Sequence, residues 1–381
     1  MLIKNQILKA VNSLSDRNKT PFYIYDIDRI RHNCNLFTSI PYKNKSIHFA
    51  TMANINAEFL KVLKNEKLSV FVNSLDHLRE VESAGFKGKD IVFTSSALND
   101  NILKTISEKE TQINLDSVSQ VERWRTLFPN RKFGIRCNIG EYVGALKTHA
   151  GYFIGKESRL GLLPAEIQKL DCKDSINGLH IYIGTDLNDL EYFLECYRIL
   201  ASFIPLFPNI DYLNLGGGFG IPKNGEDHFR IREYSYRLTE LMDSLSESHK
   251  KEIRLILEPG RIIAGDSGYF VSRVTDVKHR NGSQYIGVDA SSTQFPRPLF
   301  YQDEATHPLM IIKYGIPQKT EKGGESFVFG CSTYSRDFLA RAVILPEARI
   351  GDLLIFGNAG AYSASACTSF LGFPKPQEYF R

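Results

Sequence analysis

The chain has 381 residues, of which 43% are hydrophobic and 24% charged. This is enough apolar sequence for two domains, or for one large barrel with an appendage. The net charge of +4 is small and its Lys and Arg residues are dispersed, which argues against a nucleic-acid groove. The six cysteines contain no C-x-x-C pair, so neither zinc nor any other metal site is predicted. No run approaches the ~18 apolar residues of a membrane span, and we expect a soluble, cytoplasmic protein with no membrane contact.

Short apolar runs alternate with segments of helical periodicity through most of the chain. Strands are expected at Ser46–Thr51, Leu68–Asn73, Asp90–Thr94, Gln112–Asp116, Lys132–Asn138, Gly178–Ile183, Tyr212–Leu215 and Ile253–Glu258. Helical spacing occurs between them at Ala57–Asn65, Leu75–Ala84, Val118–Leu127 and Leu187–Ile204. Eight strand–helix units close a (β/α)8 TIM barrel, which places the chain in the α/β class.

A second, β-rich domain is predicted after the barrel. Further strand candidates follow one another without intervening helices at Gly268–Val277, Gln284–Asp289, Leu309–Ile316, Ser326–Gly330 and Asp352–Phe356. The strand-like segment Pro21–Asp26 precedes the first barrel strand and is expected to join this domain. We therefore predict a barrel over residues 27–265 and a β-rich domain from residues 1–26 and 266–381.

Two glycine-containing turns follow the last two barrel strands, Gly216–Gly220 and Glu258–Arg261. Glycines at a strand end let backbone N–H groups approach an anion without interference from a Cβ atom. Chemistry in this fold lies at the carboxyl ends of the strands, and phosphate commonly binds after strands seven and eight. The turns therefore predict a phosphate site, to which Arg261 can add a cation.

These motifs, in their order, resemble the fold type III pyridoxal-phosphate enzymes with an alanine racemase-like architecture. The similarity is greatest to the ornithine/diaminopimelate decarboxylase family, including its siderophore-pathway branch. It rests on Thr20–Asp26, Phe49–Asn54, Ile91–Thr94, Asn114–Ser117, Ser158–Gly161, Gly216–Gly220, Glu258–Arg261, Arg297-Pro298 and Gly360–Tyr362.

The resemblance implies pyridoxal 5'-phosphate as cofactor and assigns residues to it. The phosphate would be held by Gly217, Gly218, Gly260, Thr185, Arg261 and Tyr362. Glu258 would pair with the pyridine nitrogen and keep it protonated, which makes the ring a better electron acceptor. Arg136 would lie near the phenolic oxygen. A carboxylate that only caps the next segment, and an arginine in a structural ion pair, are the alternatives for Glu258 and Arg136.

The resemblance also assigns residues to the substrate. Arg297 and Tyr301 match residues that hold the distal end of diaminopimelate, and a guanidinium there favours a second carboxylate. Cys331 matches a cysteine that crosses the interface of a homodimer and protonates the substrate carbon, although a buried inert thiol is the alternative. Asp337 would receive the substrate amino group.

The chain departs from the family pattern in three places. Met52 occupies the position of the Schiff-base lysine in Phe49–Asn54, and a thioether can neither form an imine nor carry a proton. Tyr182 replaces the histidine that stacks on the ring, although tyrosine also offers an aromatic face. His180 is placed by strand alternation on the same side as Tyr182, where a packed interior histidine is equally expected. Five residues separate Cys331 from Asp337, more than the family has.

Several functions remain open on these grounds. The first is pyridoxal-phosphate-dependent decarboxylation of an amino acid or conjugate with a distal carboxylate, with activity in doubt because of Met52. The second is a non-catalytic homologue that binds a ligand without turnover. The third is an enzyme that uses His48, His180 and Cys331 with another cofactor or none, and an amino-acid racemase is a fourth by fold.

Overall fold

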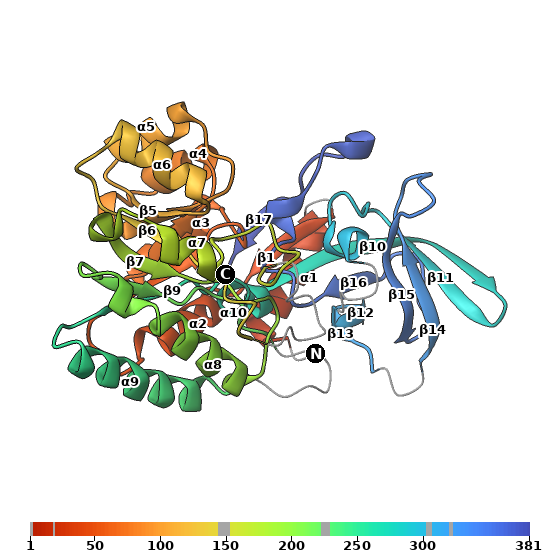
Figure 1. Ribbon diagram of the computed structural model, residues 1–381. Helices are drawn as coiled ribbons and strands as arrows, with labels where there is room; N and C mark the ends of the chain where they lie inside the picture. Colours follow the sequence, from red (N-terminus) through yellow and green to blue (C-terminus); the bar gives the residue numbers. More distant parts are fainter. Residues whose placement is uncertain (1–2, 18–19, 144–152, 222–228, 302–306, 320–322) are drawn as a thin grey trace. The chain divides into compact units, whose positions relative to one another are not determined.

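The computed structural model describes residues 3–17, 20–143, 153–221, 229–301, 307–319 and 323–381. They divide into two compact units (Figure 1). The described residues between 31 and 262 form the barrel unit, and those up to residue 30 and from residue 263 onward form the sheet unit. The predicted domains, residues 27–265 and residues 1–26 with 266–381, include some positions that lie outside the described residues.

The barrel unit contains a closed barrel of eight parallel strands, as expected. The ring closes because β2 pairs with both β3 and β9, through registers such as Phe49↔Val70 and Ser46↔Ile256. The strands are β2 (Lys45–Ala50), β3 (Ser69–Val72), β4 (Ile91–Thr94), β5 (Gln112–Leu115), β6 (Phe133–Arg136), β7 (Ile176–His180), β8 (Tyr212–Asn214) and β9 (Arg254–Leu257).

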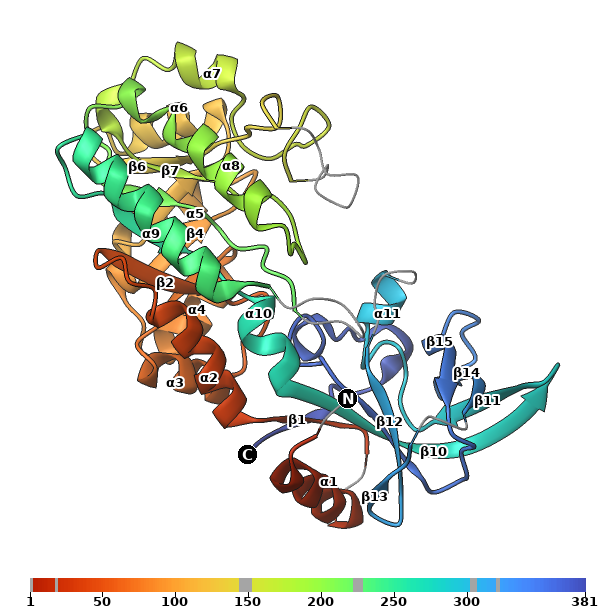
Figure 2. The ribbon, with the colours of Figure 1, turned by 90° about the horizontal axis from the view of Figure 1, so that it is seen from below.

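Helices cover the outside of the barrel, and α8 and α9 lie side by side there (Figures 1 and 2). Several begin at a side chain that accepts a backbone N–H, which satisfies a donor that the helix leaves unpaired. Those N-caps are Asn56, Ser74, Asn99, Ser117 and Asp189. The helices of this unit are α2 (Ile27–Thr38, which starts before it), α3 (Ala57–Asn65), α4 (Leu75–Ser83), α5 (Asp100–Glu108), α6 (Val118–Leu127), α7 (Pro164–Lys169), α8 (Leu190–Ala201), α9 (Ile231–Ser248) and the first residues of α10 (Arg261–Ala264).

The sheet unit is built on a nine-stranded sheet. Seven of its strands follow the order β13-β12-β16-β10-β11-β14-β15, and the other two are β1, which pairs with β10, and β17, which pairs with β1. As expected, β1 (Phe22–Tyr25) joins it across the sequence and pairs with β10 (Gly268–Arg280). The other strands are β11 (Ser283–Val288), β12 (Leu309–Lys313), β13 (Ile316–Pro317), β14 (Gly324–Phe329), β15 (Phe338–Leu345), β16 (Leu353–Phe356) and β17 (Gln377–Phe380). Strands β15 and β17 were not predicted, and the short helix α11 (Arg297–Phe300) interrupts the expected run of strands.

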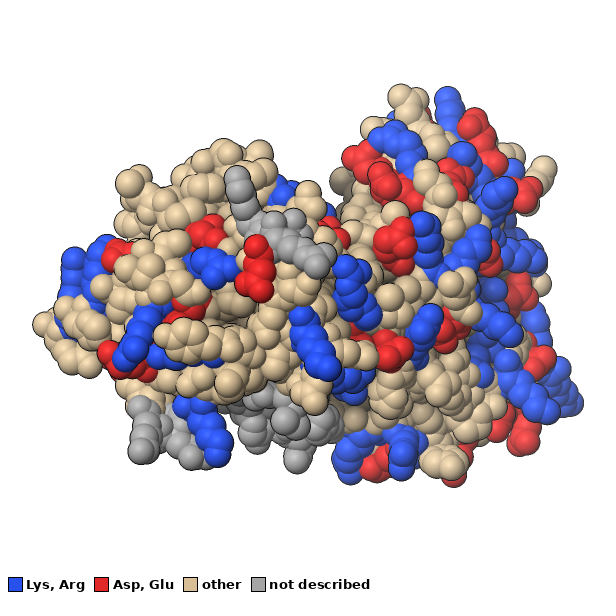
Figure 3. All heavy atoms as spheres, turned by 180° about the vertical axis from the view of Figure 1, so that it is seen from behind, with Lys and Arg blue, Asp and Glu red and all other residues tan. Residues whose placement is uncertain are grey.

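Basic and acidic side chains are intermixed on the molecular face drawn in Figure 3. No large field of one sign, of the kind that binds nucleic acid, is visible there. Within the described ranges, no helix has the length and apolar character that a membrane crossing requires. The described part of the chain also holds no cluster of three or more His, Cys, Asp or Glu residues that could bind a metal.

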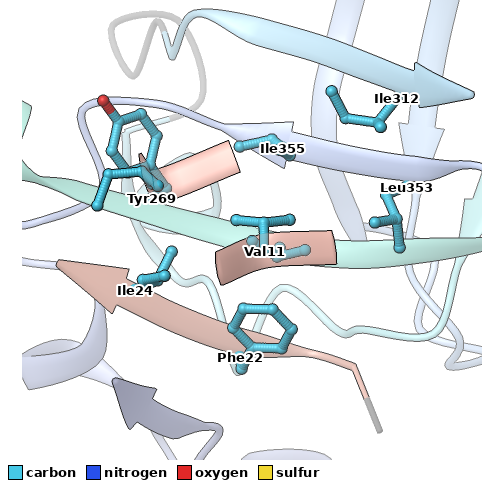
Figure 4. Close-up of a cluster of buried hydrophobic side chains, with 9 residues drawn as sticks. Val11, Phe22, Ile24, Tyr269, Ile312, Leu353 and Ile355 are labelled. Carbon is cyan, nitrogen blue, oxygen red and sulfur yellow. The ribbon is translucent and has the colours of Figure 1, made fainter. Parts of the chain in front are cut away.

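Helix α1 (Asn5–Arg17) packs on the sheet and was not predicted. Figure 4 shows Val11 of this helix between side chains of β1 and those of β16. Phe22 and Ile24 contribute from β1, and Ile355 contributes from β16. Each of these side chains is fully buried, so α1 covers apolar sheet surface that would otherwise be exposed to water.

Tyr212 on β8 is a large, buried side chain in the barrel, where it packs with Val92 and Ile256. Its hydroxyl donates to Asn114 Oδ1 at 2.8 Å. The ring lies against Gly178 of the neighbouring strand, where a Cβ atom would come within 1.9 Å of the Tyr212 ring. Gly178 is therefore glycine because the ring of Tyr212 occupies the space of a side chain.

We expect Gly178→Ala to destabilise the barrel by about 1–3 kcal/mol, because the new methyl group must displace the Tyr212 ring in a packed interior. Thermal and urea unfolding would measure this loss. Gly324→Ala is the matched control, since no atom lies within 4 Å of the added Cβ. Equal stability of the two variants would contradict this account of the barrel core.

Candidate active site

Glu258 lies at the carboxyl end of β9 and is 4% exposed. Asn214 Nδ2 donates to its Oε1 at 2.6 Å. His180 Nε2 lies 3.4 Å from its Oε2. Three neighbouring strands, β7, β8 and β9, thus bring one polar side chain each to the same buried point.

The pKa of Glu258 lies below its usual value of 4.5. Burial raises the pKa, but His180, the Asn214 hydrogen bond and His48 together lower it by more. The carboxylate is consequently ionised at neutral pH and can stabilise a cationic group, such as a protonated pyridine nitrogen. The Nδ1 atom of His180 is also buried without a hydrogen-bond partner among the described residues, as polar groups at functional sites sometimes are.

The glycine turn after β8 forms a cup of backbone donors. Gly216 and Gly218 have φ angles of +67° and +99°, which favour glycine. A Cβ atom at Gly217 would lie 2.3 Å from Glu258 O, and one at Gly218 would lie 2.4 Å from Gly184 O. Neither the Gly217 nor the Gly218 backbone N–H bonds to an acceptor among the described residues. Successive free N–H groups of this kind bind anions.

Asn214 connects the glycine cup to Glu258 and was not singled out from the sequence. Its Oδ1 accepts the Gly216 N–H at 3.0 Å, while its Nδ2 donates to Glu258. The side chain is fully buried. The available signal was a polar residue in the apolar strand that leads into the glycines.

Arg261 is paired with Asp186, another residue that sequence analysis missed. Its Nε lies 3.0 Å from Asp186 Oδ1, and both side chains are mostly buried. Asp186 follows the half-buried Thr185, and Gly260 is buried directly before Arg261. The loop of Thr185 is tied to the cup because the Leu187 N–H donates to Gly218 O at 2.9 Å. The expected phosphate residues Thr185, Gly217, Gly218 and Arg261 therefore belong to connected segments.

Arg136, at the end of β6, lies 3.8 Å from Asp116 Oδ1. Burial lowers the pKa of Arg136, while the negative charges of Asp116 and Glu258 raise it in part. Guanidinium nevertheless remains protonated in proteins. Asp116 also accepts the Gly161 N–H at 3.1 Å and the Ser96 hydroxyl, so the cation is held by an anchored carboxylate.

Met52 lies just beyond β2, at the same end of the barrel as Glu258. The two strand ends are joined by the Ala50 N–H, which donates to Pro259 O at 3.1 Å. Met52 is half-buried, and its Sδ lies 3.9 Å from Thr51 Oγ1. Lys45 begins β2 at the opposite end of the strand from Met52 and donates to Tyr42 O at 3.0 Å.

His180 and Tyr182 are separated by the end of β7, which stops at His180. The alternation expected to place both on one side does not extend to Tyr182, because that residue lies outside the strand. Tyr182 is half-buried and meets the Phe153 ring edge-on at 4.8 Å. His180 instead contacts Glu258 directly, which favours a role at the site over simple core packing.

The remaining expected residues belong to the sheet unit. Arg297 is buried at the start of α11, and Tyr301 follows that helix with 52% of its side chain exposed. Tyr362 is half-buried with a φ of +54°. Cys331 is accessible to solvent. The pKa of its thiol is nevertheless raised from the usual 9.0, mainly because the protein partly shields the sulfur from water and also because Asp337 is negatively charged. That thiol is protonated at neutral pH, as a proton donor must be.

Asp337 is buried and makes several hydrogen bonds of its own. Its carboxylate accepts from the Ser292 N–H at 2.6 Å, the Ser332 N–H at 3.1 Å and the Ser291 hydroxyl at 3.2 Å, and also from the Ser332 hydroxyl. These bonds tie the segment of Cys331 to the turn after β11. They favour a structural role for Asp337 over the expected contact with a substrate amino group.

A closed barrel with a glycine cup and a buried carboxylate, next in sequence to a β-sheet unit, defines the alanine racemase-like class of pyridoxal-phosphate proteins. The family model "Pyridoxal-dependent decarboxylase, pyridoxal binding domain" matches residues 27–265. The chain belongs to this decarboxylase family, whose cofactor is pyridoxal phosphate.

Individual relatives agree with this assignment. The diaminopimelate decarboxylase of Methanothermobacter thermautotrophicus is 29% identical over 382 residues, covering 96% of this chain and 87% of the relative. The crystal structure of the Helicobacter pylori diaminopimelate decarboxylase with L-lysine gives a TM-score of 0.85 at 25% identity, covering 97% and 93% of the two chains. The lysine/ornithine decarboxylase of Vibrio vulnificus with putrescine shares the fold, with a TM-score of 0.84 at 19% identity and coverage of 100% and 99%.

The barrel residues fit most of this cofactor. Unbonded N–H groups of the cup suit its phosphate, and the ionised Glu258 suits its ring nitrogen. They do not fit a covalent attachment after β2, because residue 52 is a methionine and none of the residues between β2 and α3 is a lysine.

We expect Asn214→Ala to raise the pKa of Glu258, because the lost hydrogen bond stabilised the ionised form. Since the folded pKa is depressed, Glu258 contributes stability above its unfolded value of about 4.5, and this is lost as the pH falls through the folded pKa. The stability difference between wild type and variant, about 1–3 kcal/mol near pH 7, should therefore shrink below pH ~4.5. Urea unfolding from pH 7 down to pH 4 checks this, and a difference independent of pH would contradict it.

We expect Asp337→Asn to lower stability by about 1–3 kcal/mol, because an amide cannot accept all the bonds that the buried carboxylate accepts. The same change removes a negative charge near Cys331, so the pKa of the thiol should fall and alkylation by iodoacetamide at pH 8 should become faster. Asp276→Asn is the control, since that carboxylate is 46% exposed and pairs with Lys278, which is equally exposed. Unchanged stability and thiol reactivity would contradict the role given to Asp337.

Proposed function

We propose that this chain is a decarboxylase-family protein that holds pyridoxal phosphate without a covalent link. The observation that supports this most strongly is the buried, ionised Glu258, connected through Asn214 to a cup of unbonded glycine N–H groups. The chemistry for which these residues are arranged is decarboxylation of an amino acid. With Met52 in the lysine position, we expect that reaction to be slow or absent in the chain as given.

Each barrel residue has a separate task in this proposal. Bound pyridoxal phosphate supplies an electron-withdrawing ring that accepts the charge left on the substrate carbon when CO2 departs. Glu258 keeps a proton on the ring nitrogen, and Asn214 fixes the orientation of that carboxylate. Gly217, Gly218, Gly260, Thr185 and Arg261 bind and orient the phosphate, to which Tyr362 would add a hydroxyl. Arg136 stabilises negative charge on the phenolic oxygen, and Tyr182 stacks on the ring.

The substrate in this proposal carries a second carboxylate. Arg297 is buried and cationic at the start of α11, and the exposed Tyr301 lies directly after that short helix. A guanidinium binds carboxylate through two parallel hydrogen bonds. Diaminopimelate, the substrate named for the Methanothermobacter relative, has such a second carboxylate, and the siderophore-pathway branch suggested by the motifs offers amino-acid conjugates of similar chemistry.

Proton transfer to the substrate carbon is assigned to Cys331 of a second subunit, so the proposal includes a cytoplasmic homodimer with shared sites. The support is the protonated state of the thiol at neutral pH and the family resemblance. A monomer in solution would remove Cys331 from this role.

A second candidate is a non-catalytic homologue that binds the cofactor or a related ligand without turnover. Met52 and Tyr182 favour it, because both replace residues that take part in chemistry while the phosphate cup and Glu258 are retained. The two candidates differ in what restoring the lysine would do.

We expect Met52→Lys to give an absorbance band near the visible range on addition of pyridoxal phosphate, because a lysine amine can form an imine with the aldehyde. If the site is otherwise intact, the variant should release CO2 from diaminopimelate at least tenfold faster than wild type. Met52→Leu is the matched control, since leucine has similar volume and no amine. A band without CO2 release would favour the non-catalytic homologue, and no binding by either protein would contradict the proposed function.

A further inference from the structure

We infer that this site selects a phosphorylated vitamin B6 ring and is indifferent to the group that stands where pyridoxal phosphate has its aldehyde. Pyridoxamine 5'-phosphate carries an amine at that position and pyridoxine 5'-phosphate carries an alcohol. Both therefore bind with an affinity similar to that of pyridoxal phosphate. The inference rests on the proposed function, namely that the glycine cup and Glu258 hold the cofactor.

The two recognition elements present in the barrel bind features that all three vitamers share. The unbonded N–H groups of Gly217 and Gly218 address the phosphate, and the ionised Glu258 addresses the ring nitrogen. Asn214 fixes these elements relative to each other through hydrogen bonds of 3.0 Å to the cup and 2.6 Å to Glu258. Neither element distinguishes an aldehyde from an amine or an alcohol.

The aldehyde gains an advantage only by forming a covalent bond, and Met52 removes its usual partner. Two other nucleophilic side chains that directly follow barrel strands, Thr51 and Cys137, are hydrogen-bonded or deeply buried. The Thr51 hydroxyl donates to Phe71 O at 2.9 Å and lies 2.8 Å from His77 Nδ1. Cys137, directly after β6, is 1% exposed, and burial raises the pKa of its thiol, which suppresses the reactive thiolate.

Met52 also removes an obstacle to the amine form. A lysine at this position is a cation that opposes the charged amine of pyridoxamine phosphate. The methionine side chain is neutral and flexible and can pack against any of the three substituents. Compared with a lysine at this position, methionine lowers the affinity for pyridoxal phosphate and raises the affinity for pyridoxamine phosphate. The affinities for the phosphorylated vitamers therefore become similar.

Isothermal titration of the full-length protein with the three phosphorylated vitamers tests the inference, with unphosphorylated pyridoxal as the control ligand. For wild type we expect dissociation constants within about threefold of one another, and binding of pyridoxal at least 100-fold weaker. For Met52→Lys we expect pyridoxal phosphate to bind at least 100-fold more tightly than pyridoxamine phosphate. Met52→Leu, which also lacks an amine, should show no such preference for pyridoxal phosphate.

Borohydride reduction followed by intact mass measurement supplies a second readout. We expect no covalent phosphopyridoxyl group on wild type and one such group on Met52→Lys. A preference of tenfold or more for pyridoxal phosphate in wild type, or a reduced adduct on any of its lysines, would overturn the inference while leaving the proposed cofactor site in place. If none of the phosphorylated vitamers binds, the proposed function itself fails.

Discussion

The hydrogen bonds of Asn214 are the interaction on which the rest of the site depends. One side-chain amide accepts the Gly216 N–H and donates to Glu258, so a single buried group fixes the glycine turn and the buried carboxylate relative to each other. An amide is suited to this because it offers a donor and an acceptor on adjacent atoms. The hydrogen bond from Asn214 Nδ2 to Glu258 also helps the carboxylate to remain ionised, although burial favours its neutral form.

In the proposed function, Met52 stands at the position of a lysine that would both attach the cofactor and take part in the chemistry. Glu258, Asn214 and the glycine turn lie together in the described structure. In the proposed function, binding depends only on non-covalent contacts with the phosphate and the ring nitrogen, which pyridoxal phosphate shares with its analogues. The ligand range of such a site is consequently broader than that of a site that forms an imine.

Sequence analysis anticipated the barrel well because each strand is a short apolar run bounded by polar residues. The eight barrel strands are confirmed, and so is the expectation that β1 joins the β-rich unit. Helix α1, β15 and β17 were missed. β15 has burial that does not alternate regularly, and β17 is short and mostly half-exposed, so neither carries the period-two pattern of a half-buried strand.

The sequence by itself determined the fold class, the family, the glycine turns and the chemical nature of residue 52, because these depend on residue type and order along the chain. Only the tertiary structure decided that Asn214 joins the cup to Glu258, that Asp186 faces Arg261 and that Asp337 is occupied by serine donors. These contacts join residues that lie on different strands and loops. Their partners are set by barrel closure and sheet pairing, which no local pattern encodes.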